Sequence, residues 1–160
     1  MRHWLGSRLI FSERKLIIMA ERDRREELAA FLHAWEDTPQ KTKKAFIRLK
    51  EDLSRRPETT LAFKARPGVS YSLRATHALQ QKRQLFVVVD AVEDPQNRWL
   101  SVCFYLDMIT DPEEKGELIP AGLLGEDGYC FNLEEWDEDY LCYLEARLDE
   151  AHSRAAKEVL

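Results

Sequence analysis

Apolar residues recur with helical spacing in two stretches of the N-terminal third of the chain. The first stretch contains Leu28, Phe31, Leu32 and Trp35, at positions i, i+3, i+4 and i+7, and predicts an amphipathic helix over residues 21–36. The second predicts a helix that ends near Arg55, with an inward stripe of four residues: Ala45, Phe46, Leu49 and Leu53.

The segment DTPQ, residues 37–40, separates these two helices. The hydroxyl of Thr38 can cap a helix, and Pro39 then occupies the first helical position, where a missing N–H costs nothing. Because the connection is this short, we expect the two helices to form a helical hairpin.

The pattern changes to that of β-strands after Pro57. Four segments are rich in β-branched and aromatic residues and are separated by turn-forming clusters: TTLAFKAR, SYSLRATH, QLFVVVDAV and RWLSVCFYLDMI. A fifth short strand is expected at GYCFNL. The segment between the fourth and fifth, TDPEEKGELIPAGLLGEDG, has four glycines and two prolines and is predicted to be a long loop.

A final helix is predicted from a possible capping box and an apolar stripe. Asn132 is followed three residues later by Glu135, and the stripe then continues through Tyr140, Leu144, Leu148, Ala151 and Ala155. The predicted fold class is therefore α+β: an antiparallel four- to five-stranded meander sheet, with an N-terminal helical hairpin and a C-terminal helix packed mainly on one face.

The domain organisation expected from 160 residues is a single α+β domain over residues 19–160. A second methionine, Met19, precedes a polar segment, so residues 1–18 are predicted to be a disordered or extension segment. A short amphipathic piece that contacts a membrane surface or a partner is the next interpretation. A signal peptide comes last, because the polar residues Ser12–Lys15 interrupt its apolar region.

The hairpin at KARPGVSYSLR predicts which side chains share a sheet face. Side chains alternate across a strand, so a two-residue turn would place Leu61 and Phe63 on the face opposite to that of Tyr71 and Leu73. An odd-numbered loop, either residues 66–68 or 67–69, instead gathers six apolar residues on one face: Leu61, Phe63, Ala65, Tyr71, Leu73 and Ala75. We therefore expect the odd loop.

The opposite face of this hairpin would then carry three cations, three hydroxyls and no acid: Lys64, Arg66, Arg74, Ser70, Ser72 and Thr76. Like charges this close repel one another, so a counter-charge is expected. It could come from within the chain, since residues 1–83 contain 19 basic and 10 acidic residues, whereas residues 84–160 contain 5 and 19. It could also come from a ligand.

The ligand hypothesis names six residues. Arg66 and Arg74 could form bidentate pairs with a carboxylate or phosphate, and Lys64 adds charge. Tyr71 or Tyr105 would lie nearby, depending on strand order, and His77 ends the second arm of the hairpin. The expected partner is an anionic small molecule or an acidic protein surface, bound by a non-catalytic binding or regulatory module.

An enzyme that uses His77 or Cys103 is the alternative class. Cys103, Cys130 and Cys142 lack CxxC spacing, and a cysteine with apolar neighbours is usually a small core residue, which favours a reducing, cytoplasmic location. The four histidines include no i, i+4 pair. No metal and no cofactor are therefore expected.

A nucleic-acid-associated protein is a further alternative, based on seven cations of the second helix: Lys41, Lys43, Lys44, Arg48, Lys50, Arg55 and Arg56. The net charge of −5 and the acidic C-terminal half oppose it, so nucleic acid is the less favoured partner. No apolar run reaches the roughly 18 residues that a membrane span needs, and no membrane partner is expected. A homodimer is left open.

Overall fold

A computed structural model describes residues 3–159, and the side chains of residues 11–159. The chain divides into two compact units, and the division falls after Trp35. The first unit contains a single helix, α1 (His3–Ala34), of 32 residues. The helix predicted over residues 21–36 therefore starts much earlier, and residues 3–18 belong to it. Among the described side chains of α1, five large apolar ones are exposed: Phe11, Leu16, Ile17, Ile18 and Met19.

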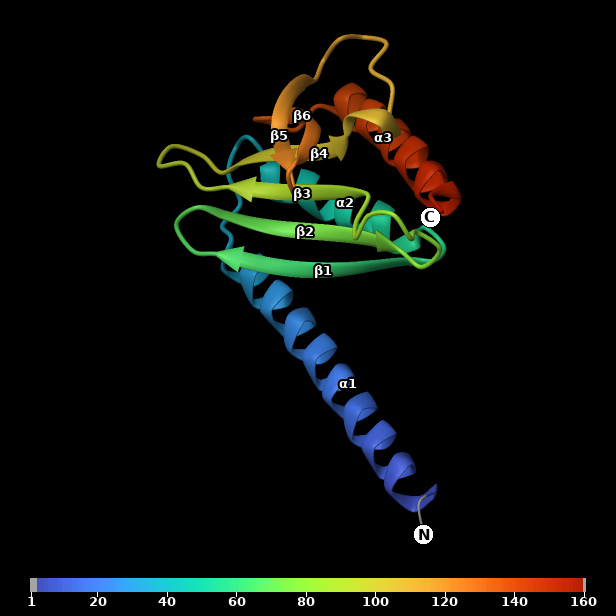
Figure 1. The fold of residues 1–160 in the computed structure, drawn as a ribbon. Helices are drawn as coiled ribbons and strands as arrows, with labels where there is room; N and C mark the ends of the chain where they lie inside the picture. The colour runs from blue at the N-terminus through green and yellow to red at the C-terminus, as the bar shows by residue number, and fades with distance from the viewer. Residues whose placement is uncertain (1–2, 160) are drawn as a thin grey trace. The chain divides into compact units, whose positions relative to one another are not determined.

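The second unit, described over residues 36–159, is an α+β fold built on one antiparallel sheet (Figure 1). Its helices are α2 (Thr42–Arg55) and α3 (Glu138–Lys157), with a short 3₁₀ turn, η1 (Leu106–Met108). Its six strands are β1 (Thr59–Arg66), β2 (Ser70–His77), β3 (Val87–Val92), β4 (Trp99–Tyr105), β5 (Glu117–Leu123) and β6 (Glu126–Leu133). The strand order β1-β2-β3-β4-β6-β5 confirms a meander-like antiparallel sheet.

One face of the sheet packs against α2 and α3. The strand register places one apolar row straight across five strands, namely Phe63, Leu73, Val89, Val102 and Phe131. All five side chains are buried, as are Phe46 and Leu49 from α2 and Leu144 and Leu148 from α3. We call this surface the packed face. Burial of its apolar area is the main source of stability for this part of the chain.

The predicted start of α2 is wrong. Thr38 and Pro39 lie outside the helix, which begins at Thr42 after Lys41 in the left-handed conformation, with φ 58°. The Thr38 hydroxyl instead donates to Asn97 Oδ1 at 3.1 Å, and the buried Thr42 hydroxyl donates to the Arg98 carbonyl at 2.7 Å. These long-range bonds tie the start of α2 to the loop before β4, a constraint that local sequence does not reveal.

The predicted capping box of the last helix is also wrong. Asn132 lies within β6, and α3 begins six residues later at Glu138. Asp137 is the N-cap, because its carboxylate accepts the Tyr140 N–H at 3.0 Å. The first turn of α3 is acidic, with Glu138 and Asp139 where the helix dipole favours anions.

The segment predicted as a long loop contains a strand. β5 lies inside it and pairs with β6, and this hairpin is inserted in reverse order, so that β6 pairs with β4 and β5 forms the outer edge. Gly116 immediately precedes β5, and a Cβ atom there would lie 2.3 Å from the Tyr129 ring, so the close approach requires glycine. The sheet thus has six strands where four or five were predicted.

In the part of the chain that the structure describes, no helix combines the length and apolar content needed to cross a bilayer.

Candidate anion-binding face

The β1–β2 hairpin has the predicted odd loop. Arg66 pairs with Ser70, which leaves Pro67, Gly68 and Val69 as a three-residue loop, and Gly68 takes φ +80°. Phe63 stands directly opposite Leu73, so the apolar residues of both arms share the packed face. The faces predicted from strand alternation are therefore confirmed for this hairpin.

The other face of the sheet carries mainly polar side chains. Its central row runs Lys64, Ser72, Asp90, Ser101 and Asn132 across β1, β2, β3, β4 and β6. Arg66 and Ser70 lie on one side of this row, and Arg74, Cys103 and Cys130 lie on the other. We call this surface the polar face, and it collects the three predicted cations Lys64, Arg66 and Arg74.

Asp90 is a counter-charge that the sequence pattern did not reveal. It lies beside Ser72, whose hydroxyl donates to Asp90 Oδ1, and both Ser70 and Ser72 are buried. Burial raises the pKa of Asp90, while the hydrogen bond from Ser72 and the charges of Arg66 and Arg74 oppose this. One partly desolvated carboxylate therefore lies under the influence of Arg66 and Arg74 on the polar face.

Several other cations of this part of the chain are paired with acids. Arg48 bridges Glu138 and Glu145 of α3 at 2.7 and 2.6 Å, and Arg56 contacts Asp52 and Asp149 at 2.8 and 3.0 Å. Arg83 contacts three carboxylates, namely Asp107, Glu126 and Glu158, at 3.0 to 3.5 Å. Most of these pairs join the basic first half to the acidic second half, as the intramolecular hypothesis expects.

The three cations of the polar face differ from these. Within residues 11–159, Lys64, Arg66 and Arg74 form no ion pair with N···O at or below 4.0 Å. Arg66 donates to the Ser70 hydroxyl at 2.8 Å. Arg74 Nε is buried and has no hydrogen-bond partner in the described structure. Intramolecular ion pairs thus account for Arg48, Arg56 and Arg83, whereas within residues 11–159 the hairpin cations have only the nearby charge of Asp90 and no direct ion pair.

Two of the predicted site residues lie away from the polar face. Tyr71 is in register with Ala65 and Ala91, which places it on the packed side, with the Arg98 guanidinium 5.0 Å from its ring centre. His77 also points to that side, because strand alternation puts it on the same face as Leu73. Tyr71 and His77 therefore do not lie on the face where a bound anion is expected.

His77 is buried against the C-terminal helix. Its ring lies 4.7 Å from that of His152, and its Nδ1 accepts the Leu79 N–H at 3.1 Å. Desolvation by burial, followed by the charge of His152, lowers the pKa of His77. Its ring therefore favours the neutral form, and it packs in the interior rather than facing a ligand on the polar face.

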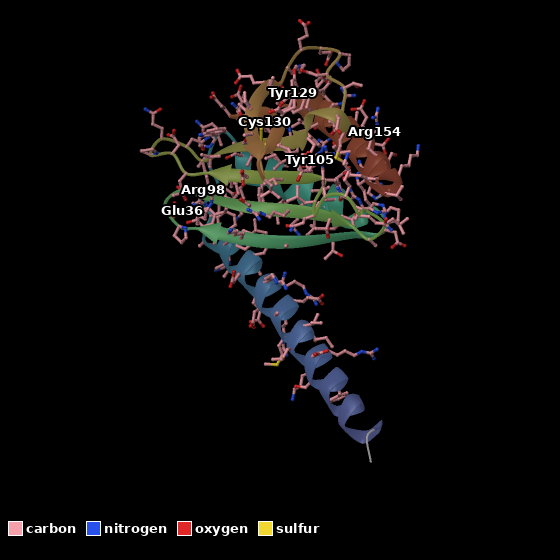
Figure 2. All side chains as sticks on the ribbon, in the orientation of Figure 1. Glu36, Arg98, Tyr105, Tyr129, Cys130 and Arg154 are labelled. Atoms are coloured by element: carbon pink, nitrogen blue, oxygen red, sulfur yellow. A yellow bond between two sulfur atoms is a disulfide. The ribbon has the colours of Figure 1, made fainter. Side chains whose placement is uncertain are left out.

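Tyr105 ends β4 on the polar side of the sheet but is covered. Its exposed fraction is 2%, and the Arg83 guanidinium lies 4.3 Å from its ring centre. Burial raises the pKa of its hydroxyl, as does the charge of Glu126. Figure 2 shows Tyr105 in the same half of the sheet as Cys130. The structure thus places Lys64, Arg66 and Arg74 on the same face of the hairpin and Tyr105 at its margin.

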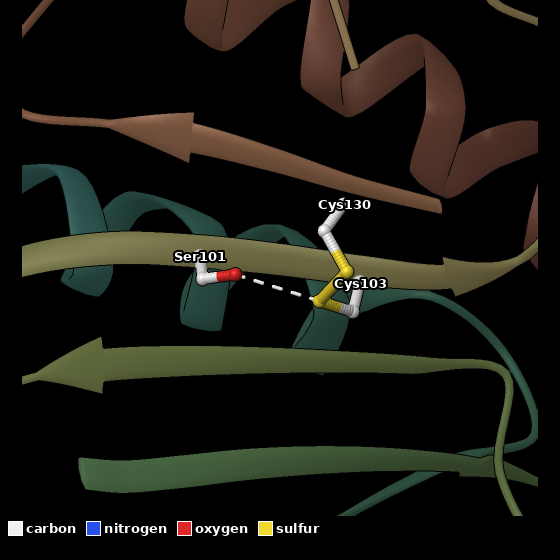
Figure 3. Close-up of a disulfide and its surroundings, with 3 residues drawn as sticks. All are labelled: Ser101, Cys103 and Cys130. Carbon is white, nitrogen blue, oxygen red and sulfur yellow. Dashed lines mark hydrogen bonds between the residues drawn. A yellow bond between two sulfur atoms is a disulfide. The ribbon is translucent and has the colours of Figure 1, made fainter. Parts of the chain in front are cut away.

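Cys103 and Cys130 form a disulfide across β4 and β6. Figure 3 shows it in front of the strands with α2 behind them, and the Ser101 hydroxyl lies 3.4 Å from Cys103 Sγ. The prediction that these cysteines are core residues is wrong, because both are only partly buried and lie on the polar face. Their pairing was missed because it depends on the register between β4 and β6, which the local sequence pattern does not reveal. Cys142 is a free, exposed thiol.

A second polar cluster surrounds Asp111 and is explained by structure. Its carboxylate accepts bonds from the hydroxyls of Tyr129 and Tyr143 and from the N–H groups of Lys115 and Gly116. Partial burial opposes ionisation, but these hydrogen bonds lower the pKa of Asp111 to about 2. The cluster fastens the turn before β5 to β6 and α3. Among the described residues, no three His, Cys, Asp or Glu side chains are grouped as metal ligands.

No protein-family model, no curated protein and no solved structure matches this chain.

Proposed function

We propose that the polar face binds a small anionic ligand through a carboxylate or phosphate group, and that the chain acts as a non-catalytic binding module. The observation that supports this most directly is the contrast among cations. Arg48, Arg56 and Arg83 each contact at least two acids, whereas Lys64, Arg66 and Arg74 contact none in the described structure.

The free-energy cost of leaving the Arg74 Nε–H without a hydrogen bond supports the presence of an external acceptor. A buried donor without a partner costs about 1–3 kcal/mol, and more when the group is charged. A carboxylate or phosphate at the Arg74 guanidinium would supply a charge-assisted acceptor that the described structure lacks, because the fork of N–H groups on a guanidinium suits such oxygens. The same anion would reduce the repulsion among the three cations.

Asp90 limits what this face would accept. Its carboxylate repels anions, but burial favours its protonated form. We place the anionic group on the Arg74 side of the polar face, because the Arg74 guanidinium has an N–H without a hydrogen-bond partner in the described structure. An acidic protein surface could offer the same carboxylates. Binding of small anions by themselves would distinguish a small anionic ligand from an acidic protein partner.

Thermal shift in a low-salt buffer tests the proposal, using inorganic phosphate, citrate and a nucleoside monophosphate as probes. A ligand at 100 times its Kd stabilises the folded state by about 2.7 kcal/mol, which raises Tm by several degrees for a domain of this size. Sodium chloride at equal ionic strength controls for screening. We expect Arg74→Gln to abolish the shift and Arg66→Gln to reduce it.

Arg55→Gln is the matched control, because Arg55 is an exposed cation on α2 and forms no ion pair within the described residues. It should leave the shift unchanged. The proposal is wrong if the three probes give no shift beyond that of sodium chloride, or if the Arg55 and Arg74 variants respond alike. Binding of a polyglutamate peptide without binding of small anions would instead indicate an acidic protein partner.

A further inference from the structure

The Cys103–Cys130 disulfide lies in the same row of the polar face as Arg74. The register runs Arg74, Val88, Cys103, Cys130 and Glu117 across five strands. Since adjacent strands are about 4.8 Å apart, the backbones of Arg74 and Cys103 are separated by about 10 Å. An extended arginine side chain covers a large part of that distance.

The floor between Arg74 and the disulfide is apolar. Val88 stands between them in the register and is buried, with an exposed fraction of 7%, so neither a charged nor a polar residue of this row separates Arg74 from Cys103. Both cysteines are partly exposed. A small thiol at Cys103 Sγ would therefore lie within about 10 Å of the Arg74 backbone, a distance over which a charge on that thiol still interacts with the guanidinium at low salt.

The charges around the two sulfur atoms are unequal. Cys103 lies on the side of the cations, and Ser101 Oγ is 3.4 Å from its sulfur. Cys130 lies next to the exposed carboxylate of Glu117 on the edge strand. An approaching anion is attracted to the Cys103 side and repelled on the Cys130 side.

We propose that this disulfide is a thiol-exchange site that prefers small anionic thiols and is attacked at Cys103. The inference rests on the proposed function, since it uses the same cations. In the first step the thiolate forms a bond to Cys103 Sγ, the Cys103–Cys130 bond breaks, and its electron pair leaves on Cys130 Sγ, which takes a proton from water.

A second thiolate completes the reduction. It attacks the sulfur of the bound small thiol, the mixed disulfide breaks, and the electron pair leaves on Cys103 Sγ. The hydroxyl of Ser101 is placed to donate a hydrogen bond to the resulting thiolate. Two small thiols are thus oxidised to one small disulfide, and the protein disulfide is reduced by two electrons to Cys103 and Cys130 thiols.

Exchange kinetics with three thiols of different charge test this inference: 2-mercaptoethanesulfonate (anionic), 2-mercaptoethanol (neutral) and cysteamine (cationic). Rates are corrected for thiolate fraction and divided by the rate with a small neutral reference disulfide. A Cys142→Ser background removes the free thiol. We expect the anionic thiol to be favoured over the cationic one by roughly fivefold at low salt, from one partly screened charge interaction.

Variants identify the origin of the preference. Arg74→Gln should reduce it to near unity, Arg66→Gln should lower it less, and Arg55→Gln should leave it unchanged. Melting temperatures confirm that each variant is folded. Trapping the first adduct, followed by peptide mass analysis, should locate the small thiol on Cys103.

Three results would overturn the inference: no charge preference, an adduct mainly on Cys130, or a protein purified without reductant in which both thiols are free. If citrate and phosphate still stabilise the protein in any of these cases, the anion-binding proposal stands and only the exchange site fails. Charge-selective exchange without any stabilisation by citrate or phosphate would leave the exchange site and reject the binding module.

Discussion

The two faces of the one sheet satisfy their side chains in different ways. On the packed face, Leu73 and its neighbours are buried by α2 and α3 and need nothing from outside the chain. On the polar face, one strand position away, Ser72 and Asp90 are hydrogen-bonded to each other, while Arg74 Nε has no acceptor among the described residues. The two faces thus separate residues that specify the fold from residues available for a ligand.

The same contrast holds between the helices and the hairpin. Arg48 on α2 is held between two acids of α3, so its charge contributes to helix packing. These ion pairs partly neutralise the basic helix on which the nucleic-acid alternative is based. That alternative stays a prediction, and fewer unpaired cations support it. The hairpin cations have no comparable acidic helix among the described residues.

The largest expected change in the free energy of unfolding comes from a substitution on the packed face. Leu73→Ala removes a fully buried side chain from the centre of the apolar row and should lower the free energy of unfolding by about 2–5 kcal/mol. Urea denaturation measures it. Lys64→Gln, on the neighbouring strand and the other face, should change it by less than about 0.5 kcal/mol. Equal effects of the two changes would contradict the division into two faces.

The next effect concerns the ion pairs between α2 and α3. Arg48→Gln leaves Glu138 and Glu145 without their shared partner and should cost about 1–3 kcal/mol of unfolding free energy, since these bonds involve charged groups. Arg55→Gln is again the control and should be nearly neutral. If the Arg48 change is also neutral, the ion pairs of the α2 cations do not contribute to stability. The contrast between these paired cations and the hairpin cations would then be unsupported.

Asp111 gives a pH dependence with a definite sign. Its pKa is lowered to about 2 in the folded state, below an unfolded value of about 3.9. The stabilisation is therefore complete above about pH 4 and is lost as the pH falls through about 2. Asp111→Asn should lower stability at pH 7 and flatten the decline at acidic pH, measured by thermal melts from about pH 7 to about pH 2. An unchanged acid decline would show that other carboxylates cause it.

The smallest effect on stability is expected at Asp90. Because burial raises its pKa, the fold disfavours the charged form, so Asp90→Asn should change stability at pH 7 by no more than about 1 kcal/mol in either direction. The same change removes a negative charge from the polar face and should strengthen the thermal shift with citrate. A weakened shift would mean that Asp90 positions the ligand rather than repels it.

The hairpin was predictable because its information is local. Alternation within TTLAFKAR and SYSLRATH, together with the parity of the loop, determines which residues share a face, and the Phe63–Leu73 pair follows. The cationic cluster could be found for the same reason. Neither step needed to know where any other strand lies.

The missed features depend on pairings between distant segments. Asp90 becomes the counter-charge only through the β2–β3 register, and Cys103 meets Cys130 only because β6, not β5, pairs with β4. β5 itself is difficult to predict because six of its seven residues are exposed and Pro120 interrupts it. An edge strand of this kind lacks the buried alternation that a sequence pattern can detect.

The disulfide closes a segment of the chain that includes η1, the turn at Asp111 and all of β5. Its cysteines are 27 positions apart, and such a cross-link restricts the unfolded chain by an amount worth about 3 to 4 kcal/mol in the loop-closure model. Reduction of the disulfide would lower the local stability of β5 and of the turn at Asp111. It would affect the β1–β2 hairpin less directly, because that hairpin lies outside the closed segment. Proteolytic cleavage after Lys115 would then report the oxidation state of the protein.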